Sequence, residues 1–274
     1  MRWILTKRFG WIGFTLVWLG CTTHPFQSTN RDYKQQARNL SKVLREQPIV
    51  PTNDTLVQPK HWVGTTNFNL RKPGYVIIHH TAQNACLQTL QTFTTPASQV
   101  SAHYVICKDG TVHHMLNDYL RAAHAGVSRW GNLIDINSAS IGIELDNNGF
   151  EPFDSLQLNS LISLLAVLQQ KYNIPKANFI GHGDIAPTRK NDPNYRFPWK
   201  LLADRGFGLW YADTPAPAPA GFNQWQALRV IGYDMKDSSA ALRAFKRHFL
   251  QDSTRRALTD SDKAILYDLQ KKYF

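Results

Sequence analysis

Residues 178–193 read NFIGHGDIAPTRKNDP, and this stretch decides how the rest of the chain is interpreted. Its apolar start predicts a buried strand, and the loop that follows carries a histidine, a lysine and an aspartate among glycines and prolines. A second histidine, His79, ends the predicted strand 75–78. Two imidazoles and one carboxylate, each at a strand end or in a loop, suit a zinc site with an open fourth position.

The spacing limits which side chains can share such a site. His79 and His80 are neighbours on one strand, so they face opposite sides and only one of them can bind the metal. Asp192 lies ten residues after His182, and neither a helical nor a strand period brings these two together. The loop must therefore curl around the ion, and its glycines and prolines make such a turn possible.

Several further blocks resemble one known family, the type 2 N-acetylmuramoyl-L-alanine amidases, and within it the membrane-anchored lipoprotein amidases. These sequence motifs occur in family order and cover roughly residues 60–205. Besides 181–193, the matching blocks are IHHTA (78–82), SAHYVI (101–106), AHAGVSRW (123–130), IGIEL (141–145) and FPW (197–199). The resemblance implies an α/β fold with a central, mainly mixed sheet flanked by helices, and strands alternating with helices along the chain agree with it.

The resemblance also implies a set of site residues. It assigns His79, His182 and Asp192 as the ligands of one zinc ion per chain. Glu144 lies inside the predicted strand 140–145, an odd place for a carboxylate unless it points into a site, and the resemblance makes it the general base. Lys190, two residues before a metal ligand, would stabilise the negative charge of the reacting carbonyl oxygen.

Three more residues match the family blocks without a settled role. The resemblance makes His103, His124 and Trp130 candidates for substrate binding. His103 would line the cleft or orient a metal ligand from behind, and His124 would contact the sugar or the peptide. For both histidines a packing role remains the alternative.

The function implied is zinc-dependent hydrolysis of the amide between the lactyl group of N-acetylmuramic acid and L-alanine of peptidoglycan stem peptides, in cell-wall turnover or remodelling. The alternative is a non-catalytic peptidoglycan receptor on the same fold. Such receptors lose a zinc ligand, whereas this chain keeps all three. A zinc peptidase of another fold is disfavoured because no His-Glu-x-x-His sequence occurs. We expect a monomer that binds peptidoglycan or muropeptides.

Charge and the N-terminus point to the cell envelope. The chain has 274 residues with 31 Lys and Arg against 20 Asp and Glu, which favours an anionic partner. No nucleic-acid motif occurs, so we predict a wall or membrane surface and no nucleic acid. Residues 1–20 resemble a signal peptide, and its apolar part is too short to span a bilayer. Cys21 then resembles a lipidated cysteine, which implies an outer-membrane lipoprotein facing the periplasm; the alternative is a secretory peptide followed by a chance cysteine.

The remaining organisation follows from composition and periodicity. We expect a spacer with the lipidated cysteine (21–60), a catalytic domain (61–212), a Pro/Ala linker (213–220) and three helices (221–274) that resemble a peptidoglycan-binding module. The alternative for the last part is a merely structural cap. Its helices are expected at about 223–231, 238–249 and 260–273, the last capped by Thr259, and Trp225, Leu228 and Phe245 are among the residues expected in a small shared core. Segment 241–249 resembles the central helix of such a module.

Within these parts, helices are expected at 32–45, 84–94 (capped by Asn84) and 154–172 (capped by Asp154), with a hairpin at 103–115. Cys86 and Cys107 form either a disulfide or two small buried side chains.

Overall fold

The computed structural model of the chain describes residues 25–46, 64–254 and 256–273. They belong to two compact units, 1–66 and 67–274. Described residues of the first unit form helix α1 (Gln27–Val43), which begins earlier than expected. The predicted signal peptide and Cys21 lie outside the described residues. Where the structure describes the chain, no helix combines the length and the apolar character needed to cross a membrane.

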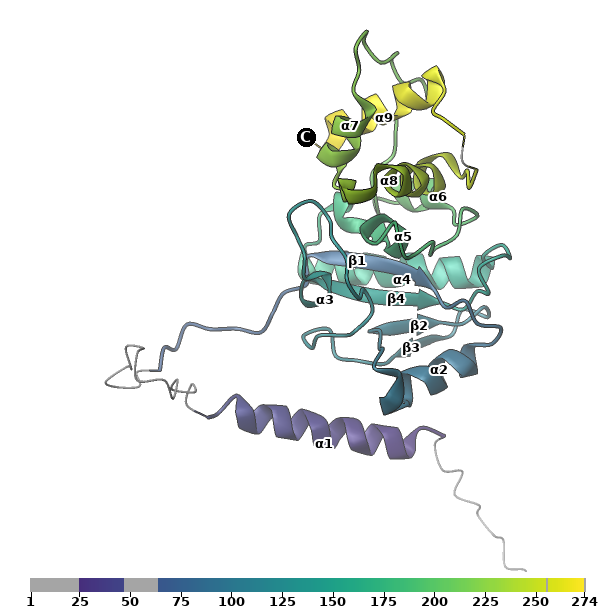
Figure 1. Cartoon of the computed structure of the whole chain (residues 1–274). Helices are drawn as coiled ribbons and strands as arrows, with labels where there is room; N and C mark the ends of the chain where they lie inside the picture. The colour runs from purple at the N-terminus through teal and green to yellow at the C-terminus, as the bar shows by residue number, and fades with distance from the viewer. Residues whose placement is uncertain (1–24, 47–63, 255, 274) are drawn as a thin grey trace, which may run out of the picture. The chain divides into compact units, whose positions relative to one another are not determined.

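The second unit is built on one mixed sheet with the strand order β3-β2-β4-β1-β5 (Figure 1). Strand β1 (Tyr75–His80) pairs in parallel with β4 (Ser140–Leu145) and β5 (Phe179–Gly181). Strand β2 (Tyr104–Ile106) runs parallel to β4 and antiparallel to β3 (Val112–His114). The mixed α/β sheet and the hairpin are thus as predicted.

One face of the sheet is covered by α4 (Ser155–Tyr172) and α6 (Trp199–Asp204). Val76 and Ile78 of β1 point to this face, where they pack with the apolar side of α4. The predicted capping of α4 by Asp154 does not form: Asp154 is the N-cap residue but its side chain makes no capping hydrogen bond. Gln157, three residues further on, is buried and donates to two backbone carbonyls near the ends of β2 and β4.

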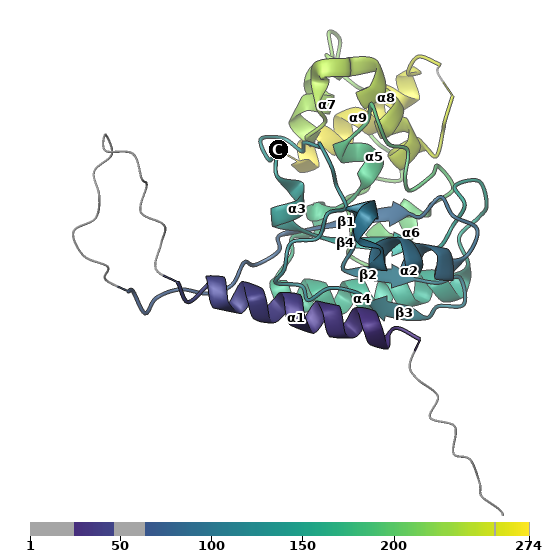
Figure 2. The same ribbon diagram turned by 60° about the horizontal axis from the view of Figure 1, so that its bottom comes forward.

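The other face is covered by the short helix α5 (His182–Ile185) and by the C-terminal helices, which lie together next to α5 in both views (Figures 1 and 2). Ile77 and Ile180 point to this face and join one hydrophobic core with the C-terminal helices. The C-terminal elements are α7 (Gln224–Ile231), α8 (Ser238–Phe245), a π-helical turn (Lys246–Leu250) and α9 (Asp260–Tyr273).

These helices follow the prediction in position but not in every contact. Thr259 caps α9 as expected, since its hydroxyl accepts the Asp262 N–H and Asp262 accepts the Thr259 N–H. Trp225 was expected in the core, but 41% of its surface is exposed. Leu228 and Phe245 of the predicted cluster are buried, and they pack in the same core as the sheet residues.

The remaining elements are short. Helix α2 (Cys86–Thr94) begins two residues after Asn84, so Ala85 is its N-cap residue and the expected capping is wrong. A disulfide joins Cys86 to Cys107, with Cα atoms 5.4 Å apart, and thereby ties α2 to the end of β2. The others are α3 (Ile136–Ala139) and three 3₁₀ turns at Pro96–Ser98, Lys176–Asn178 and Met235–Asp237.

Candidate metal and catalytic site

Three side chains converge at the carboxyl ends of β1 and β5. His79 comes from β1, His182 follows β5 directly, and Asp192 comes from the loop after α5. The two Nδ1 atoms are 2.9 Å apart, and Asp192 Oδ2 lies 3.1 Å from that of His79 and 3.0 Å from that of His182. All three side chains are buried. Parallel pairing of β1 with β5 explains why histidines distant in sequence meet here.

Hydrogen bonds on the far side of each imidazole indicate where its proton lies. His182 Nε2 faces the carbonyl oxygen of Ala125 at 3.1 Å, and a carbonyl only accepts, so Nε2 carries the proton. Ser140 Oγ gives its proton to a backbone carbonyl and therefore accepts from His124 Nε2. His124 Nδ1 then accepts from His79 Nε2 at 3.0 Å. Both His79 and His182 are left with a lone pair on Nδ1.

The three inner atoms of the cluster are thus all acceptors. In a neutral ring only one nitrogen carries a proton, and burial, followed by the neighbouring His182 ring, lowers the pKa of His79 to about 4. Burial likewise holds the pKa of His124 well below its ordinary value. Three acceptors crowded together repel one another unless a cation lies between them. Two imidazole nitrogens and one carboxylate oxygen fit zinc.

The loop between His182 and Asp192 is closed by its own backbone and by one arginine. The Gly183 N–H donates to the Asp192 carbonyl at 2.6 Å, which joins the two ends of the loop. The guanidinium of Arg189 donates to the carbonyl of Ala125 and to that of residue 127. These contacts hold the curled loop that the sequence predicts. They bring His182 and Asp192 together although no helical or strand period does so.

Glu144 lies beside His79 because β4 and β1 are in register at these two residues. Its Oε1 is 4.0 Å from His79 Nδ1, while its Oε2 is buried and has no hydrogen-bond partner in the part of the chain that the structure describes. Burial, and then the charge of Asp192, raise the pKa of Glu144 to about 8, although Lys190 opposes the shift. A buried carboxylate with a free oxygen at this position is well placed to accept a proton from water.

Lys190 is exposed at the rim of the same loop. Its backbone N–H donates to the Ala186 carbonyl at 2.9 Å, so its Cα is held next to the site. Its charge also acts on the buried groups: burial is the main cause of the shifts at His79 and Glu144, but Lys190 lowers the pKa of both. An ammonium on a flexible stem at this rim is able to approach an anion formed beside the cluster.

The structure places His103, His124 and Trp130, the candidates for substrate binding, in buried positions. His103 is fully buried, and both of its ring nitrogens contact backbone groups. His124 uses both ring nitrogens in the hydrogen bonds described above, behind His79. Trp130 packs against Gly232 and meets the ring of Tyr233 edge-on at 5.1 Å. Their positions favour packing and orientation, the alternative that the sequence left open for the histidines.

The other candidate ligands are separated from this cluster or already bonded. His80 points to the opposite face, as strand alternation requires, and its Nδ1 accepts the Asn194 N–H at 3.2 Å. Cys86, Cys107 and His113 also lie close together, but the two sulfurs are bonded to each other.

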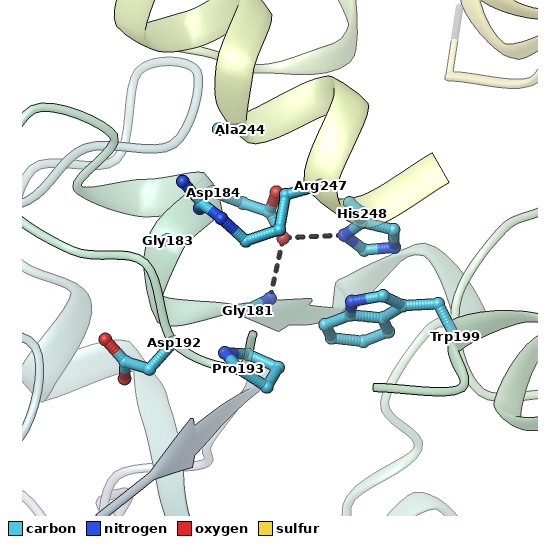
Figure 3. Close-up of a pocket in the computed structure, with 9 residues that line it drawn as sticks. All are labelled: Gly181, Gly183, Asp184, Asp192, Pro193, Trp199, Ala244, Arg247 and His248. Carbon is cyan, nitrogen blue, oxygen red and sulfur yellow. Dashed lines mark hydrogen bonds and ion pairs between the residues drawn. The ribbon is translucent and has the colours of Figure 1, made fainter. Parts of the chain in front are cut away.

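Asp184 is a buried residue to which the sequence reasoning attached no role. Its carboxylate accepts hydrogen bonds from Gly181, Tyr233 and His248, and Figure 3 shows it next to Arg247. A carboxylate two residues after a predicted metal ligand was a visible signal. Its partners in the C-terminal helices lie 49 and 64 residues further along the chain, which no local pattern reveals.

Comparison with known proteins agrees with this geometry. Residues 69–195 match the family described as N-acetylmuramoyl-L-alanine amidase. The amidase AmiD of Escherichia coli is 31% identical over 230 residues, which cover 72% of this chain and 82% of AmiD. The chain belongs to the N-acetylmuramoyl-L-alanine amidase family. It is therefore an amidase and not a non-catalytic receptor on the same fold.

Other relatives cover different shares of the chain. The 1,6-anhydro-N-acetylmuramyl-L-alanine amidase AmpD of Haemophilus influenzae is 40% identical over 103 residues, 37% of this chain and 56% of AmpD. The structure is similar to that of Escherichia coli AmiD, with a TM-score of 0.66 and 28% identity over 83% of this chain and 99% of AmiD. It is also similar to AmpDh3 of Pseudomonas aeruginosa, with a TM-score of 0.68 and 29% identity over 80% of this chain and 98% of AmpDh3.

Proposed function

We propose that this amidase depends on zinc and cleaves the amide between the lactyl group of N-acetylmuramic acid and L-alanine of the stem peptide. The observation that carries the proposal is the convergence of three unprotonated ligand atoms from His79, His182 and Asp192. When bound there, zinc would act as a Lewis acid and lower the pKa of a water molecule.

The protein's own residues supply the proton transfer and the charge. Glu144 accepts the proton of the attacking water through its unpaired oxygen and later returns it to the leaving amine. In the metal-free protein burial raises the pKa of Glu144 to about 8, so the protonated form that the donation step needs is accessible near neutral pH. Lys190 stabilises the negative charge that develops on the carbonyl oxygen.

The metal is tested by zinc content and activity in the full protein. We expect about one zinc per chain, with loss of activity in chelator and recovery when zinc is restored. Asp192→Ala should lose zinc and activity together, whereas Asp118→Asn, a substitution at a buried aspartate outside the cluster, should keep both. Full activity in rigorously metal-free protein would contradict the zinc mechanism.

Muropeptides are the proposed substrates because solved relatives are bound to them. AmiD is described in complex with anhydro-N-acetylmuramic acid-L-Ala-D-γ-Glu-L-Lys, and AmpDh3 with an anhydromuramic pentapeptide. Digestion of purified sacculi and of anhydromuropeptides, followed by mass analysis, should release free stem peptides that begin with L-alanine. Products cut at any other bond would contradict the proposal.

For location, we propose a lipoprotein of the outer membrane, anchored through Cys21 and facing the periplasm. The charges of helix α1 support a location beside an anionic surface. One side of the helix carries four basic residues at three- and four-residue spacing: Arg31, Lys34, Arg38 and Lys42. Cys21→Ser should move the protein from the membrane fraction to the soluble fraction. Unchanged membrane partition in that variant would contradict the anchor.

We also propose that the C-terminal helices bind peptidoglycan. The segment 241–249, which resembles the central helix of such modules, forms α8 and most of the π-helical turn. Trp225, on α7, offers an exposed aromatic ring. An inactive Glu144→Gln protein should sediment with sacculi, and adding Trp225→Ala should weaken that binding. Equal sedimentation of both proteins would argue against this surface.

A further inference from the structure

Asp184 is held by three hydrogen-bond donors from separate parts of the chain. Its Oδ2 accepts the Gly181 N–H at 2.9 Å and faces His248 Nδ1 at 2.7 Å (Figure 3). Its Oδ1 accepts the Tyr233 hydroxyl at 2.9 Å. Asp184, Tyr233 and His248 are each 3% exposed. Hydrogen bonds to a carboxylate are strong in such a buried environment, and losing one donor is costly.

Two of these donors come from the C-terminal helices. Tyr233 follows α7, and His248 lies in the π-helical turn after α8. The His248 ring stacks on Trp199 with 3.9 Å between ring centroids and 11° between planes, which fixes the direction of its Nδ1. The guanidinium of the preceding residue, Arg247, crosses Gly183 so closely that no Cβ fits there without movement of the arginine.

The position of Asp184 matters because it lies on the same four-residue helix as His182. A helix of four residues has almost no stability of its own, so tertiary contacts must hold it. Gly183, between the two residues, donates to the Asp192 carbonyl. A displacement of Asp184 would therefore move His182 and Asp192, two of the three proposed ligands.

We propose that Tyr233 and His248 are positioning residues of the metal site: through Asp184 they hold α5 and the 181–193 loop so that His182 and Asp192 face His79. The C-terminal helices would thus position the metal ligands, in addition to the proposed binding of peptidoglycan. This inference rests on the proposed zinc function, and it predicts that zinc affinity depends on residues outside 61–212.

The test compares variants that differ in one donor. His248→Ala and Tyr233→Phe should weaken zinc binding by about 10- to 100-fold in competition with a chromophoric chelator, as for other residues that orient ligands. His248→Asn places an amide N–H where Nδ1 was, and it should recover most of the affinity. Because these variants remove single donors, KM for muropeptides should change less than kcat.

A matched control lies in the same turn. Lys246 is buried and donates to the carbonyls of Thr254 and Arg256, away from the metal loop. Lys246→Met should lower the melting temperature while leaving zinc affinity at the parent value. Equal zinc affinity in His248→Ala and the parent, or an equal loss in Lys246→Met and His248→Ala, would overturn the inference.

Hydrogen exchange in metal-free protein separates this inference from the zinc proposal. His248→Ala should speed exchange of the 181–193 amides relative to the parent, and Lys246→Met should not. A parent protein that binds no zinc would refute the proposed function, yet the exchange comparison would still decide whether the C-terminal helices hold the loop. Unchanged exchange in His248→Ala would overturn the positioning role.

Discussion

Asp118 and Glu144 are two carboxylates in buried surroundings of the same fold, and their environments are opposite. Asp118 accepts hydrogen bonds from the hydroxyls of Tyr104 and Tyr172 at 2.8 and 2.7 Å and from Lys171 at 3.2 Å. Glu144 keeps one buried oxygen without a hydrogen-bond partner among the described residues. Burial favours the neutral form of both, but at Asp118 the hydrogen bonds outweigh it and the pKa is lowered.

The difference separates a structural carboxylate from the proposed general base. At Asp118 the fold has supplied donors for both oxygens, so the group links β2 and α4 to the loop that follows β3. At Glu144 one carboxylate oxygen accepts no hydrogen bond. Burial without such a bond destabilises the charged form, and the pKa rises to about 8. A proton or a substrate group is then the missing partner, as expected for a catalytic base.

The largest expected effect follows from removing the base. Glu144→Gln keeps the shape of the side chain but cannot accept the proton, so kcat should fall by about 10² to 10⁴-fold. Zinc content and muropeptide affinity should remain near those of the parent. Loss of zinc in this variant would make Glu144 a ligand or a folding residue instead.

The same variant tests the raised pKa through stability. A group whose pKa is raised on folding binds its proton more tightly in the folded state, so its contribution to stability is lost as pH rises toward about 8. In metal-free protein, Glu144→Gln should therefore be more stable than the parent at neutral pH, and the difference should shrink below the ordinary value of 4.5. Thermal unfolding across pH 4 to 8 measures it.

A smaller effect is expected at Lys190, which opposes the raised pKa of Glu144. Lys190→Ala should lower kcat by about 10- to 100-fold, less than the loss of a fixed oxyanion donor because the lysine is mobile. The acidic limb of the kcat/KM profile should move to higher pH. Lys200→Ala is the matched control, because it removes the same charge from a surface ion pair with Asp204. It should change neither kcat nor the acidic limb of the kcat/KM profile.

The smallest effect on catalysis is expected at Asp118. Asp118→Asn removes the carboxylate charge that accepts three hydrogen bonds, so it should lower the free energy of unfolding by about 1 to 3 kcal/mol. Below the melting temperature, kcat should stay the same. Because the pKa of Asp118 is lowered on folding, this contribution is present above its ordinary value of 3.8 and is lost as pH falls further. Parent and variant should therefore converge in stability at acidic pH. A difference in stability that persists at acidic pH would mean that the substitution acts through side-chain packing and not through the charge of Asp118.

Strand alternation and parallel pairing account for what the sequence could predict. Apolar runs located β1, β4 and β5, and alternation along β1 alone separates His79 from His80. The pairing of His182 with Asp192 came only from the family resemblance, because a loop closed by backbone contacts has no periodicity. Residues whose partners lie far along the chain escaped prediction, as Asp184 illustrates.

The histidines behind the metal cluster show the same limit. The roles of His103 and His124 depend on which backbone groups face their rings, and those groups come from distant loops. Composition places both in buried blocks but cannot tell a ring that faces a cleft from a ring that faces a carbonyl.

The hydrophobic core that joins Ile77 and Ile180 of the sheet to Leu228 and Phe245 of the C-terminal helices has a consequence for proteolysis. The Pro/Ala stretch 213–220 is largely exposed, so a protease should reach it. Cleavage there would break the covalent connection but leave this apolar interface closed, because separating the fragments would expose it to water. The two fragments should therefore elute together on gel filtration, as a heterodimer produced from one chain.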